Sequence, residues 1–560
     1  MDFDFSHYFT YAEIVAFLER YQAQYPNLIA LETIGKSYEG RDIWLATLTN
    51  QNTGDAIAKP GYWLDANTHA GEVTGSAVVL YILHYLLTTY GEDAQSVRLL
   101  DGYTVYILPR ITVDGSEKYL TTPYLLRSSP RPYPHPEPKD GLYQEDINGD
   151  GLILDMRVKD PCGAWKKCEE DPRAMVRREP EEFGGEYYTV FSEGLIRNYD
   201  GYEIPAAPRF EGLDFNRNYP FQWQTESEQR GAGDFPYSEP ETRAEAEFWR
   251  SHNNINSFIT YHTYSAVILR PYSTHADDHF PTADLDLYQF VGDKGKEITG
   301  YECVSVYHDF RYDPKSFTTG SMDDHGYDNF GWLGFTVELW DAATAAGIEK
   351  NGYVEWFRWH PPSDEVKLLQ WSDEELDGKG FIDWQPFEHP QLGPVEIGGW
   401  DFKNVWQNAP EKYLPELCEK QAKFAIAHAL MSPKLAFSRV ECVAVSGDVY
   451  RIFVQIENQG FLPTYSTEKA LERKQVEPIR AVIELPLGCS LVTGKAEQTL
   501  GQLAGRSNKY TRARASEIDY RRKVEWVIQG VAGSEVELRI LSDRAGHLAT
   551  SIELNPDSVI

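Results

Sequence analysis

Two residues with metal-binding side chains lie three positions apart in Asn67-Thr-His-Ala-Gly-Glu-Val73, and a third lies far downstream in Thr260-Tyr-His-Thr-Tyr264. We expect a turn of helix or a tight bend to point His69 and Glu72 at one place, where His262 completes a triangle. Two histidines and one glutamate suit zinc and leave one coordination position open. Structural zinc sites fill all four positions with protein atoms, so this set predicts a catalytic metal that acidifies a water molecule.

Two further segments carry polar groups that suit the same chemistry. Asn216 and Arg217 lie in the turn-like segment 212–219, where a guanidinium beside an amide suits a free carboxylate. Glu338 is the charged residue in the apolar run Gly334-Phe-Thr-Val-Glu-Leu-Trp340. A buried carboxylate is costly without a partner, and a metal-bound water is a suitable one.

The elements that must position these residues alternate between strand and helix. Thr10-Tyr-Ala-Glu13 is typical of a capping box and predicts a helix over residues 11–25, and the apolar pattern predicts another over 73–90. Ser238-Glu-Pro-Glu241 is interpreted as the cap of a third helix. Short apolar runs predict strands at residues 28–34, 42–49, 62–66, 104–108, 257–261 and 335–339. This order predicts an α/β fold with a mixed, largely parallel sheet between helices, and it places the polar candidates just past strand ends, where ligands bind.

Length and local composition predict two domains. A chain of 560 residues is too long for one ordinary core. We assign residues 1–433 to a catalytic domain whose insertion, at about 130–208, is rich in Pro, Gly and charged residues and shows no periodicity. Residues 434–560 contain β-branched alternating runs separated by turn signals, which predict a β-sandwich domain.

Composition limits the partners and the compartment. The formal net charge of −33 disfavours nucleic acid and anionic membrane surfaces. We see no apolar run near the ~20 residues of a membrane helix, and the acidic start lacks the features of a secretory signal. Six cysteines are too few for a disulfide scaffold, and we expect free thiols. These observations favour the cytoplasm as the default location, although a secreted mature form would have the same sequence features.

As an ordered set, these motifs resemble the M14 family of zinc metallocarboxypeptidases over about residues 10–341. The segments that carry the resemblance are Tyr38-Glu-Gly-Arg-Asp-Ile-Trp44 and residues 67–75, 108–115, 214–218, 238–242, 261–265 and 335–339. The resemblance implies a zinc ion held by His69, Glu72 and His262 and a general base at Glu338. It also implies that Asn216 and Arg217 recognise the free C-terminal carboxylate of a peptide substrate whose last peptide bond is hydrolysed.

Some positions of the family pattern are less directly matched. Family members use an arginine to hold the developing oxyanion, and we favour Arg127 over Arg157 for that role. Tyr312 is the nearest candidate for the family's mobile capping tyrosine. Asp323 stands where the family carries its specificity residue, and a carboxylate there favours basic C-terminal residues; alternatively, Asp323 is solvated or caps a turn. The family's frequent Asn-Pro-Asp-Gly is Thr112-Val-Asp-Gly115 here.

The insertion contains one further cation motif. Asp146-Ile-Asn-Gly-Asp-Gly151 places Asp146, Asn148 and Asp150 at the spacing of a calcium loop. The twelfth position, which should be a bidentate glutamate, is Arg157. The loop either binds Ca²⁺ through Asp155 and backbone carbonyls or is an Asx-rich turn.

Two rival functions remain open at this point. One is a zinc amidohydrolase that deacylates N-acyl amino acids, because related enzymes share the His-x-x-Glu and Asn-Arg elements. The other is a catalytically silent protein that binds peptides or glycans in the cleft or on the sandwich. Retention of Glu338 with all three metal ligands argues against the silent protein.

Overall fold

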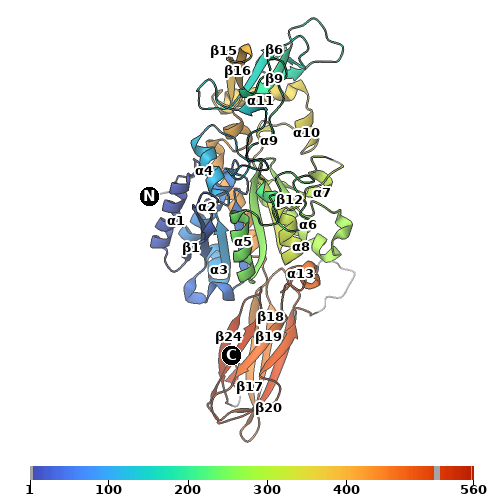
Figure 1. The fold of residues 1–560 in the computed structure, drawn as a ribbon. Coiled ribbons are helices and arrows are strands. Elements are labelled where there is room, and N and C mark those ends of the chain that lie inside the picture. The colour runs from blue at the N-terminus through green and yellow to red at the C-terminus, as the bar shows by residue number, and fades with distance from the viewer. Residues whose placement is uncertain (1–3, 314, 510–517, 556–557, 560) are drawn as a thin grey trace.

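The computed structural model describes residues 4–313, 315–509, 518–555 and 558–559. Three bodies follow one another along the long axis of the molecule (Figure 1). The central body contains an eight-stranded sheet between helices, a six-stranded sheet lies at one end, and two antiparallel sheets at the other end carry the C-terminus.

The central sheet is mixed and has a parallel centre. Its strand order is β1-β2-β4-β3-β11-β14-β12-β13, with parallel pairing from β4 through β3 and β11 to β14. The strands are β1 (Ile29–Lys36), β2 (Asp42–Leu48), β3 (Gly61–Ala66), β4 (Thr104–Leu108), β11 (Ile255–Thr263), β12 (Val267–Arg270), β13 (Glu302–Ser305) and β14 (Leu333–Leu339). The predicted strands and the predicted α/β class are therefore confirmed.

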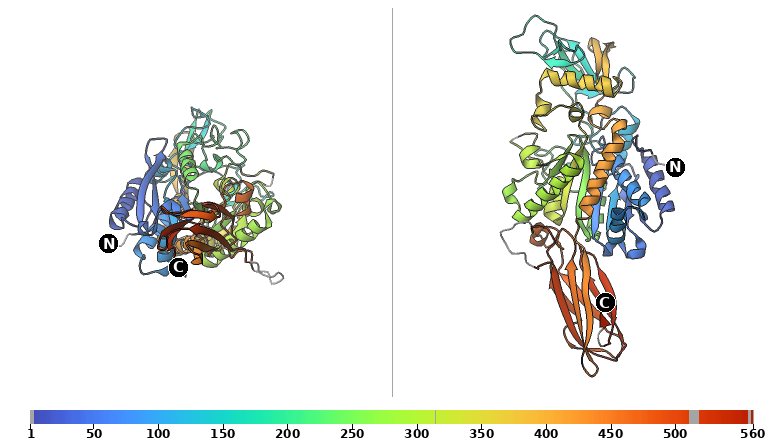
Figure 2. Two further views of the ribbon diagram at one scale, coloured as in Figure 1. Left: turned by 90° about the horizontal axis from the view of Figure 1, so that it is seen from below. Right: turned by 180° about the vertical axis from the view of Figure 1, so that it is seen from behind.

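Helices cover both faces of this sheet because its central strands are apolar on both sides. Tyr62 and Leu64 of β3 belong to one buried cluster, whereas Trp63 between them belongs to another on the opposite face. The longer helices are α1 (Tyr11–Gln24), α2 (Thr74–Thr88), α3 (Ala94–Gly102), α4 (Val113–Thr121), α5 (Pro240–Ser251), α6 (Thr282–Thr299), α8 (Met322–Phe330), α11 (Pro362–Glu375) and α12 (Leu414–Ala429). Seen from behind, α12 is the orange helix that runs along the central body (Figure 2).

A side-chain cap was predicted at the starts of α1 and α5, and the structure has it at α1 alone of these two. Thr10 and Glu13 make the predicted capping box at the start of α1. The interpretation of Ser238-Glu-Pro-Glu241 as a side-chain cap was wrong. Helix α5 does begin at Pro240, but its N-cap residue Glu239 makes no capping hydrogen bond, and the Ser238 hydroxyl donates to the Glu239 carboxylate instead. That carboxylate is occupied by Arg131, whose Nη2 lies 2.7 Å from Glu239 Oε1.

The insertion is structured, which corrects the expectation of a segment without periodicity. Its strands are β5 (Gly141–Gln144), β6 (Asp155–Lys159), β7 (Trp165–Lys167), β8 (Met175–Arg177), β9 (Tyr188–Ser192) and β10 (Gly194–Arg197). Strand β6 pairs with β16 (Gly393–Trp400), which pairs with β15 (Phe381–His389), so two distant segments build one six-stranded sheet. Helix α11 packs against this sheet through Val366 and Leu369. The short helices of the central and upper bodies include α7 (Val306–Asp309), α9 (Ala342–Ala345), α10 (Glu355–Arg358) and the π-helical turn η5 (Phe402–Trp406).

The C-terminal strands form two facing antiparallel sheets around one apolar cluster. One sheet has the order β20-β22-β18-β17-β25 and the other β21-β19-β23-β24. The strands are β17 (Leu435–Ser446), β18 (Val449–Asn458), β19 (Ile479–Glu484), β20 (Ser490–Thr493), β21 (Glu497–Gly501), β22 (Arg521–Gln529), β23 (Glu535–Leu541), β24 (Leu548–Glu553) and β25 (Ser558–Val559). The all-β character of this segment is confirmed, whereas the domain bounds 1–433 and 434–560 stay a prediction.

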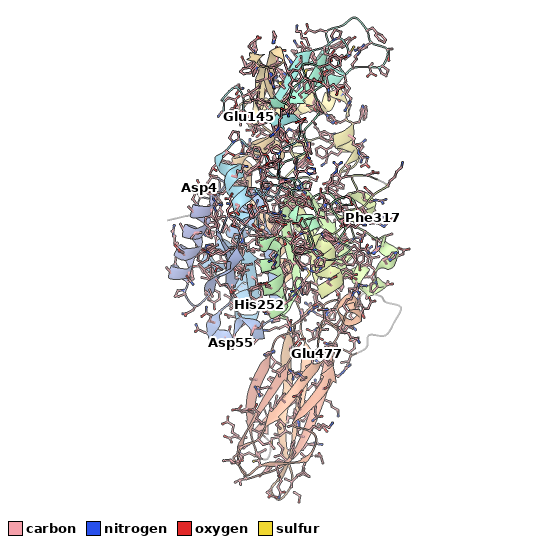
Figure 3. All side chains as sticks on the ribbon, in the orientation of Figure 1. Asp4, Asp55, Glu145, His252, Phe317 and Glu477 are labelled. Carbon is pink, nitrogen blue, oxygen red and sulfur yellow. The ribbon has the colours of Figure 1, made fainter. Side chains whose placement is uncertain are left out.

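The sandwich is attached to the central body next to helix α8. Glu477 lies near the junction (Figure 3). The buried Arg544 of the sandwich donates to the carbonyl oxygens of Phe330 and Gly331, at 2.9 Å for Gly331. Short helix α13 (Glu468–Glu472) also packs here: Asp284 of α6 accepts the backbone N–H groups of Glu468 and Lys469. Polar contacts therefore fix the sandwich to the C-terminal end of α8.

Two further observations concern the helices and the cysteines of the described residues. None of the helices that the structure describes is long and apolar enough to span a membrane. All six cysteines are free thiols, including Cys162 and Cys168 of the insertion.

Candidate metal centre

The three predicted metal ligands meet at one buried point. His69 Nδ1 lies 2.8 Å from Glu72 Oε1, and His262 Nδ1 lies 3.0 Å from Glu72 Oε2. The two imidazole Nδ1 atoms are 3.1 Å apart. All three side chains are buried, so a cation bound here would be largely shielded from bulk water.

The parallel pairing of β3 and β11 brings these ligands together. Tyr261 is in register with Ala66, the last residue of β3, so His262 near the end of β11 lies at the same edge of the sheet as the loop that carries His69 and Glu72. Helix α2 follows at once and approaches the sheet closely. A Cβ on Gly75 would lie 3.0 Å from the Ala66 Cβ atom, which leaves little room for a larger residue at that position.

The donor atoms fit a zinc ion. His69 Nε2 lies 3.1 Å from Asp214 Oδ1, so Asp214 can accept a ring proton on Nε2, and that tautomer leaves Nδ1 as an electron-pair donor. Two such lone pairs and a carboxylate at mutual distances near 3 Å repel one another unless a cation lies between them. Imidazole nitrogen and carboxylate oxygen are ligands that zinc accepts.

Charge around the ligands keeps Glu72 ionised. Burial alone would raise the pKa of Glu72, but His69 and His262 outweigh it and hold the pKa below its ordinary value. Arg127 contributes as well, because its Nη1 lies 3.2 Å from Glu72 Oε1. Glu72 is therefore present in the form that binds metal.

Asp214 is a functional candidate that the sequence reasoning missed. One of its oxygens accepts from His69, and the other lies 3.0 Å from Arg127 Nε. Burial opposes its ionisation, but Arg127, Arg217 and His69 hold the pKa of Asp214 well below its ordinary value. Asp214 precedes the Asn216-Arg217 pair in the same motif, and a carboxylate beside predicted carboxylate-binding groups was the available signal.

Glu338 lies beside the ligand cluster, as predicted. On strand β14 it is in parallel register with His262 of β11, the neighbouring strand. Its Oε2 atom is buried and has no hydrogen-bond partner among the residues that the structure describes. Burial and the charge of Glu72 raise the pKa of Glu338 well above its ordinary value in the metal-free protein. An unpartnered carboxylate beside an open metal position is arranged to accept a proton there.

The two arginines considered for the oxyanion role occupy different bodies of the molecule. Arg127 contacts Glu72 and Asp214 at the ligand cluster. Arg157 lies on β6 of the six-stranded sheet, where its Nε is 2.9 Å from Glu396 Oε2 and its guanidinium stacks over Trp384. The geometry supports Arg127 for the oxyanion role, whereas the contacts of Arg157 belong to the packing of the six-stranded sheet.

The predicted carboxylate-binding pair lies on a short 3-10 turn, η3 (Phe215–Arg217), next to Asp214. Asn216 Oδ1 accepts the Met322 N–H at 2.8 Å, which connects the turn to the start of helix α8. Arg217 Nη1 donates to the Asn216 carbonyl at 2.7 Å, and Arg217 Nη2 lies 4.0 Å from Asp214 Oδ2. Arg217 therefore lies beside the ligand cluster, where its carboxylate partner Asp214 is a long 4.0 Å away.

Asp323 is buried in the first turn of helix α8. It accepts the Asp324 N–H at 3.0 Å, and its charge reaches Glu338. The neighbouring Asp324 accepts the Ser273 N–H at 2.7 Å, and burial together with Asp323 raises its pKa. Asp323 is therefore not solvated, so a solvated surface carboxylate is excluded. A role in the first turn of α8 and a role in substrate specificity are left.

Tyr312 is an exposed residue near the candidate metal centre. Its side chain is 62% exposed, and it interacts electrostatically with Glu338, Arg127 and Arg217. This placement agrees with a residue at the rim of the site, and the capping role stays a prediction.

The motif over residues 38–44 supports the site indirectly. Asp114, in Thr112-Val-Asp-Gly115 at the start of α4, accepts hydrogen bonds from Ser37 Oγ at 2.8 Å, Glu39 N at 2.8 Å and Arg41 Nη1 at 2.7 Å. The changed loop thus keeps its aspartate in use as a buried anchor for the β1–β2 hairpin.

The suggested calcium loop is held by its own hydrogen bonds. Asp146 accepts backbone N–H groups from Gly149 at 2.7 Å and Gly151 at 2.9 Å. Asn148 Nδ2 donates to Asp150 Oδ2 at 2.9 Å. These are the contacts of an Asx-rich turn, the second of the two alternatives.

The fold and site define a class of metal-dependent hydrolases in which three protein ligands leave a position open beside a buried carboxylate. Residues 14–358 match the Peptidase_M14 family model, described as zinc carboxypeptidase. Because this match spans more than half of the chain, the protein belongs to the zinc carboxypeptidase family. Residues 434–553 match a domain of unknown function, DUF8731.

Individual relatives are similar over parts of the chain. Carboxypeptidase A6 of Homo sapiens is 24% identical over 355 residues, which cover 60% of this chain and 61% of that protein. Carboxypeptidase D of Anas platyrhynchos is 29% identical over 115 residues, 20% of this chain and 8% of that protein. The chain thus spans less than two thirds of these relatives. The crystal structure of carboxypeptidase A from Helicoverpa armigera superposes with a TM-score of 0.43 at 15% identity, covering 76% of this chain and 74% of that one.

Proposed function

We propose that this protein is a zinc-dependent carboxypeptidase that hydrolyses the last peptide bond of peptides with a free C-terminal carboxylate. The observation that carries the proposal is the Glu338 carboxylate beside the His69, Glu72 and His262 cluster, because its Oε2 atom is buried without a hydrogen-bond partner among the described residues. A silent binding protein gains nothing from a buried carboxylate oxygen without a partner, which costs about 1–3 kcal/mol.

His69, Glu72 and His262 would hold the metal. A bound zinc ion supplies Lewis acidity, which lowers the pKa of water and polarises a carbonyl group. Glu338 takes a proton from the attacking water and returns it to the amine nitrogen that leaves. Asp214 fixes the His69 tautomer, so that Nδ1 stays free for the metal.

Positive groups around the cluster would bind the substrate. Arg127 donates to the carbonyl oxygen as negative charge develops on it, a contribution of roughly 3–4 kcal/mol for one donor. Arg217 and the amide of Asn216 hold the terminal carboxylate, since the ion pair of Arg217 with Asp214 is long, at 4.0 Å, and Nη2 makes no hydrogen bond to it. The substrate carboxylate would supply a closer partner.

Asp323 would select basic C-terminal residues. Its buried carboxylate lies near Glu338, and it has no cationic partner among the described residues, so a Lys or Arg side chain of the substrate can supply one. Comparing Asp323→Asn with the parent on peptides ending in Lys and in Leu tests this role. We expect kcat/KM for the Lys peptide to fall about tenfold or more while the Leu peptide changes little, because one buried charge pair is lost. An unchanged Lys/Leu ratio would contradict the proposal.

The main alternative is deacylation of N-acyl amino acids, which needs the same metal and carboxylate-binding groups. Parallel assays of hippuryl-type peptides and N-acyl amino acids distinguish the two functions. Metal analysis of the purified protein, together with a peptide library read at the C-terminus, tests the proposal itself. A metal-loaded protein that releases no C-terminal residue from any member would refute it.

Three smaller proposals accompany the main one. A cytoplasmic location and a lack of nucleic-acid partners stay predictions from the sequence. Calcium binding at Asp146, Asn148 and Asp150 is disfavoured by the internal hydrogen bonds of that loop. A calorimetric titration with Ca²⁺ that gives no heat would leave the turn as its sole role.

A further inference from the structure

A buried segment beyond the family match contacts the loop that carries two metal ligands. Residues 401–409, here called the strap, connect strand β16 of the six-stranded sheet to the chain leading into helix α12. The family model covers residues 14–358, so the strap lies outside it. Its last part, around Asn408, packs against residues 71–74, and Asn408 is only 1% exposed.

The Asn408 amide holds the chain on both sides of Glu72. Its Nδ2 donates to the Gly71 carbonyl at 2.8 Å, and its Oδ1 accepts from Thr74 N at 3.1 Å and Thr74 Oγ1 at 3.0 Å. Gly71 immediately precedes Glu72, and Thr74 is the first residue of helix α2. Glu72 is therefore fixed between two anchored backbone positions.

This contact replaces a missing helix cap. The N-cap residue of α2 is Val73, which has no side-chain acceptor and makes no capping hydrogen bond. Buried N–H groups at a helix start need a partner, and Asn408 supplies one from a distant part of the chain. Without it, the ligand loop would lose the acceptor that orders its end.

Neighbouring strap residues reinforce the contact. The Gln407 side chain lies so close to Gly71 that a Cβ there would be 2.6 Å from Gln407 Nε2. Gln407 Oε1 accepts from Tyr119 at 3.0 Å, and the same tyrosine oxygen lies 3.1 Å from Asn408 Nδ2. The polar groups of the strap are thus satisfied by one network around the ligand loop.

The strap also contacts the residue that follows the strand of Glu338. Trp340, two residues beyond Glu338, donates its indole N–H to the Val405 carbonyl at 2.7 Å, and this contact is buried. The strap therefore touches the ligand loop through Asn408 and the end of the Glu338 strand through Val405. The strap begins directly after β16, so it connects the six-stranded sheet to the ligand loop and to the end of the Glu338 strand.

We propose that Asn408 is a metal-site positioning residue and that the strap sets the placement of Glu72 relative to Glu338. The inference rests on the metal site of the proposed function. Partners behind metal ligands commonly contribute 10–100-fold to metal affinity, because they fix the orientation of the ligand. Here the contact acts on the backbone that carries Glu72.

The test measures zinc affinity by competition with a chromogenic chelator, and kcat and KM on a C-terminal dipeptide substrate. Asn408→Ala removes both hydrogen-bonding groups, and we expect zinc affinity to fall about 10–100-fold and kcat to fall with little change in KM. Asn408→Asp keeps the acceptor for Thr74 but loses the donor to Gly71, so its affinity should be intermediate. Asn404→Ala is the matched control, because Asn404 is an exposed strap residue whose amide binds Asp401 within the strap.

The outcomes are distinguishable. A folded Asn408→Ala variant that binds zinc within threefold of the parent overturns the proposal, whatever its melting temperature. An equal loss in Asn404→Ala overturns it as well, because the effect would then belong to the strap as a whole. If the parent binds zinc and releases no C-terminal residue, the proposed function fails, yet a loss of zinc affinity specific to Asn408 would still support the positioning role.

Discussion

Replacing Glu338 with glutamine should lower activity and raise the stability of the metal-free protein. The substitution keeps the size of the side chain but removes its ability to take up a proton. General base catalysis contributes roughly 10²–10⁴-fold, so kcat should fall by that factor, equivalent to about 2.7–5.4 kcal/mol. KM should change little, because Glu338 is assigned to proton transfer and not to holding the ground state.

Stability should move in the opposite direction. Glu338 Oε2 is buried without a partner, and burial with the charge of Glu72 raises its pKa well above the ordinary 4.5. A raised pKa means that the folded metal-free protein holds a proton that the unfolded chain releases, so its stability falls as pH rises above about 4.5. Each pH unit inside that window costs up to about 1.4 kcal/mol, and glutamine removes the loss.

Two assays on one pair of proteins measure this prediction. Peptide hydrolysis is followed with equal zinc occupancy, and urea unfolding of the metal-free proteins is followed at pH 5 and pH 8. We expect the variant to gain about 1–3 kcal/mol over the parent at pH 8 and clearly less at pH 5. A variant within tenfold of the parent in kcat, or one that is less stable at pH 8, would show that Glu338 is an ordinary structural carboxylate.

Three further predictions test other parts of the structure. Arg127→Ala should lower kcat/KM about 10²–10³-fold, whereas Arg157→Ala should leave the kinetics of the folded enzyme unchanged and lower its unfolding free energy; the reverse pattern would exchange their roles. Glu241→Gln should raise the unfolding free energy at pH 8 by at most about 3 kcal/mol, because burial raises the pKa of Glu241 to about 7 and the folded parent loses stability between pH 4.5 and 7; a difference between variant and parent that is the same at pH 4.5 and at pH 8 would refute this. Arg544→Ala should lower the urea midpoint by the equivalent of about 2–3 kcal/mol, since two carbonyls of the central body lose a buried donor, while the exposed Arg539→Ala serves as the control.

Most of the central body could be predicted from short-range sequence patterns. The capping box of Thr10 and Glu13, and the apolar runs of the inner strands, are local signals that the tertiary structure does not override. His69 and Glu72 could be paired because three residues separate them, and His262 followed from the end of another buried strand. Glu338 reaches the metal ligands only because β14 lies next to β11 in the sheet. The parallel β11–β14 pairing places Glu338 opposite His262.

The insertion could not be predicted in the same way. Its strands contain three to five residues each, too few for an alternating pattern to emerge from a background of Pro, Gly and charge. Several of them are held by partners far away in sequence: Arg157 of β6, for example, is opposite Glu396 of β16. A strand whose pairing partner lies more than two hundred residues downstream leaves no local trace of its structure.

The strap shows the same limit at the functional site. Asn408 contacts Thr74 across 334 residues, and nothing in its own neighbourhood marks it as different from Asn404, which faces solvent four residues earlier. Val73 offered an indirect signal, because a helix start without a capping side chain implies a buried acceptor supplied from elsewhere. A missing cap beside predicted metal ligands indicates where a distant segment must supply a hydrogen-bond acceptor. Which segment does so follows only from the three-dimensional structure.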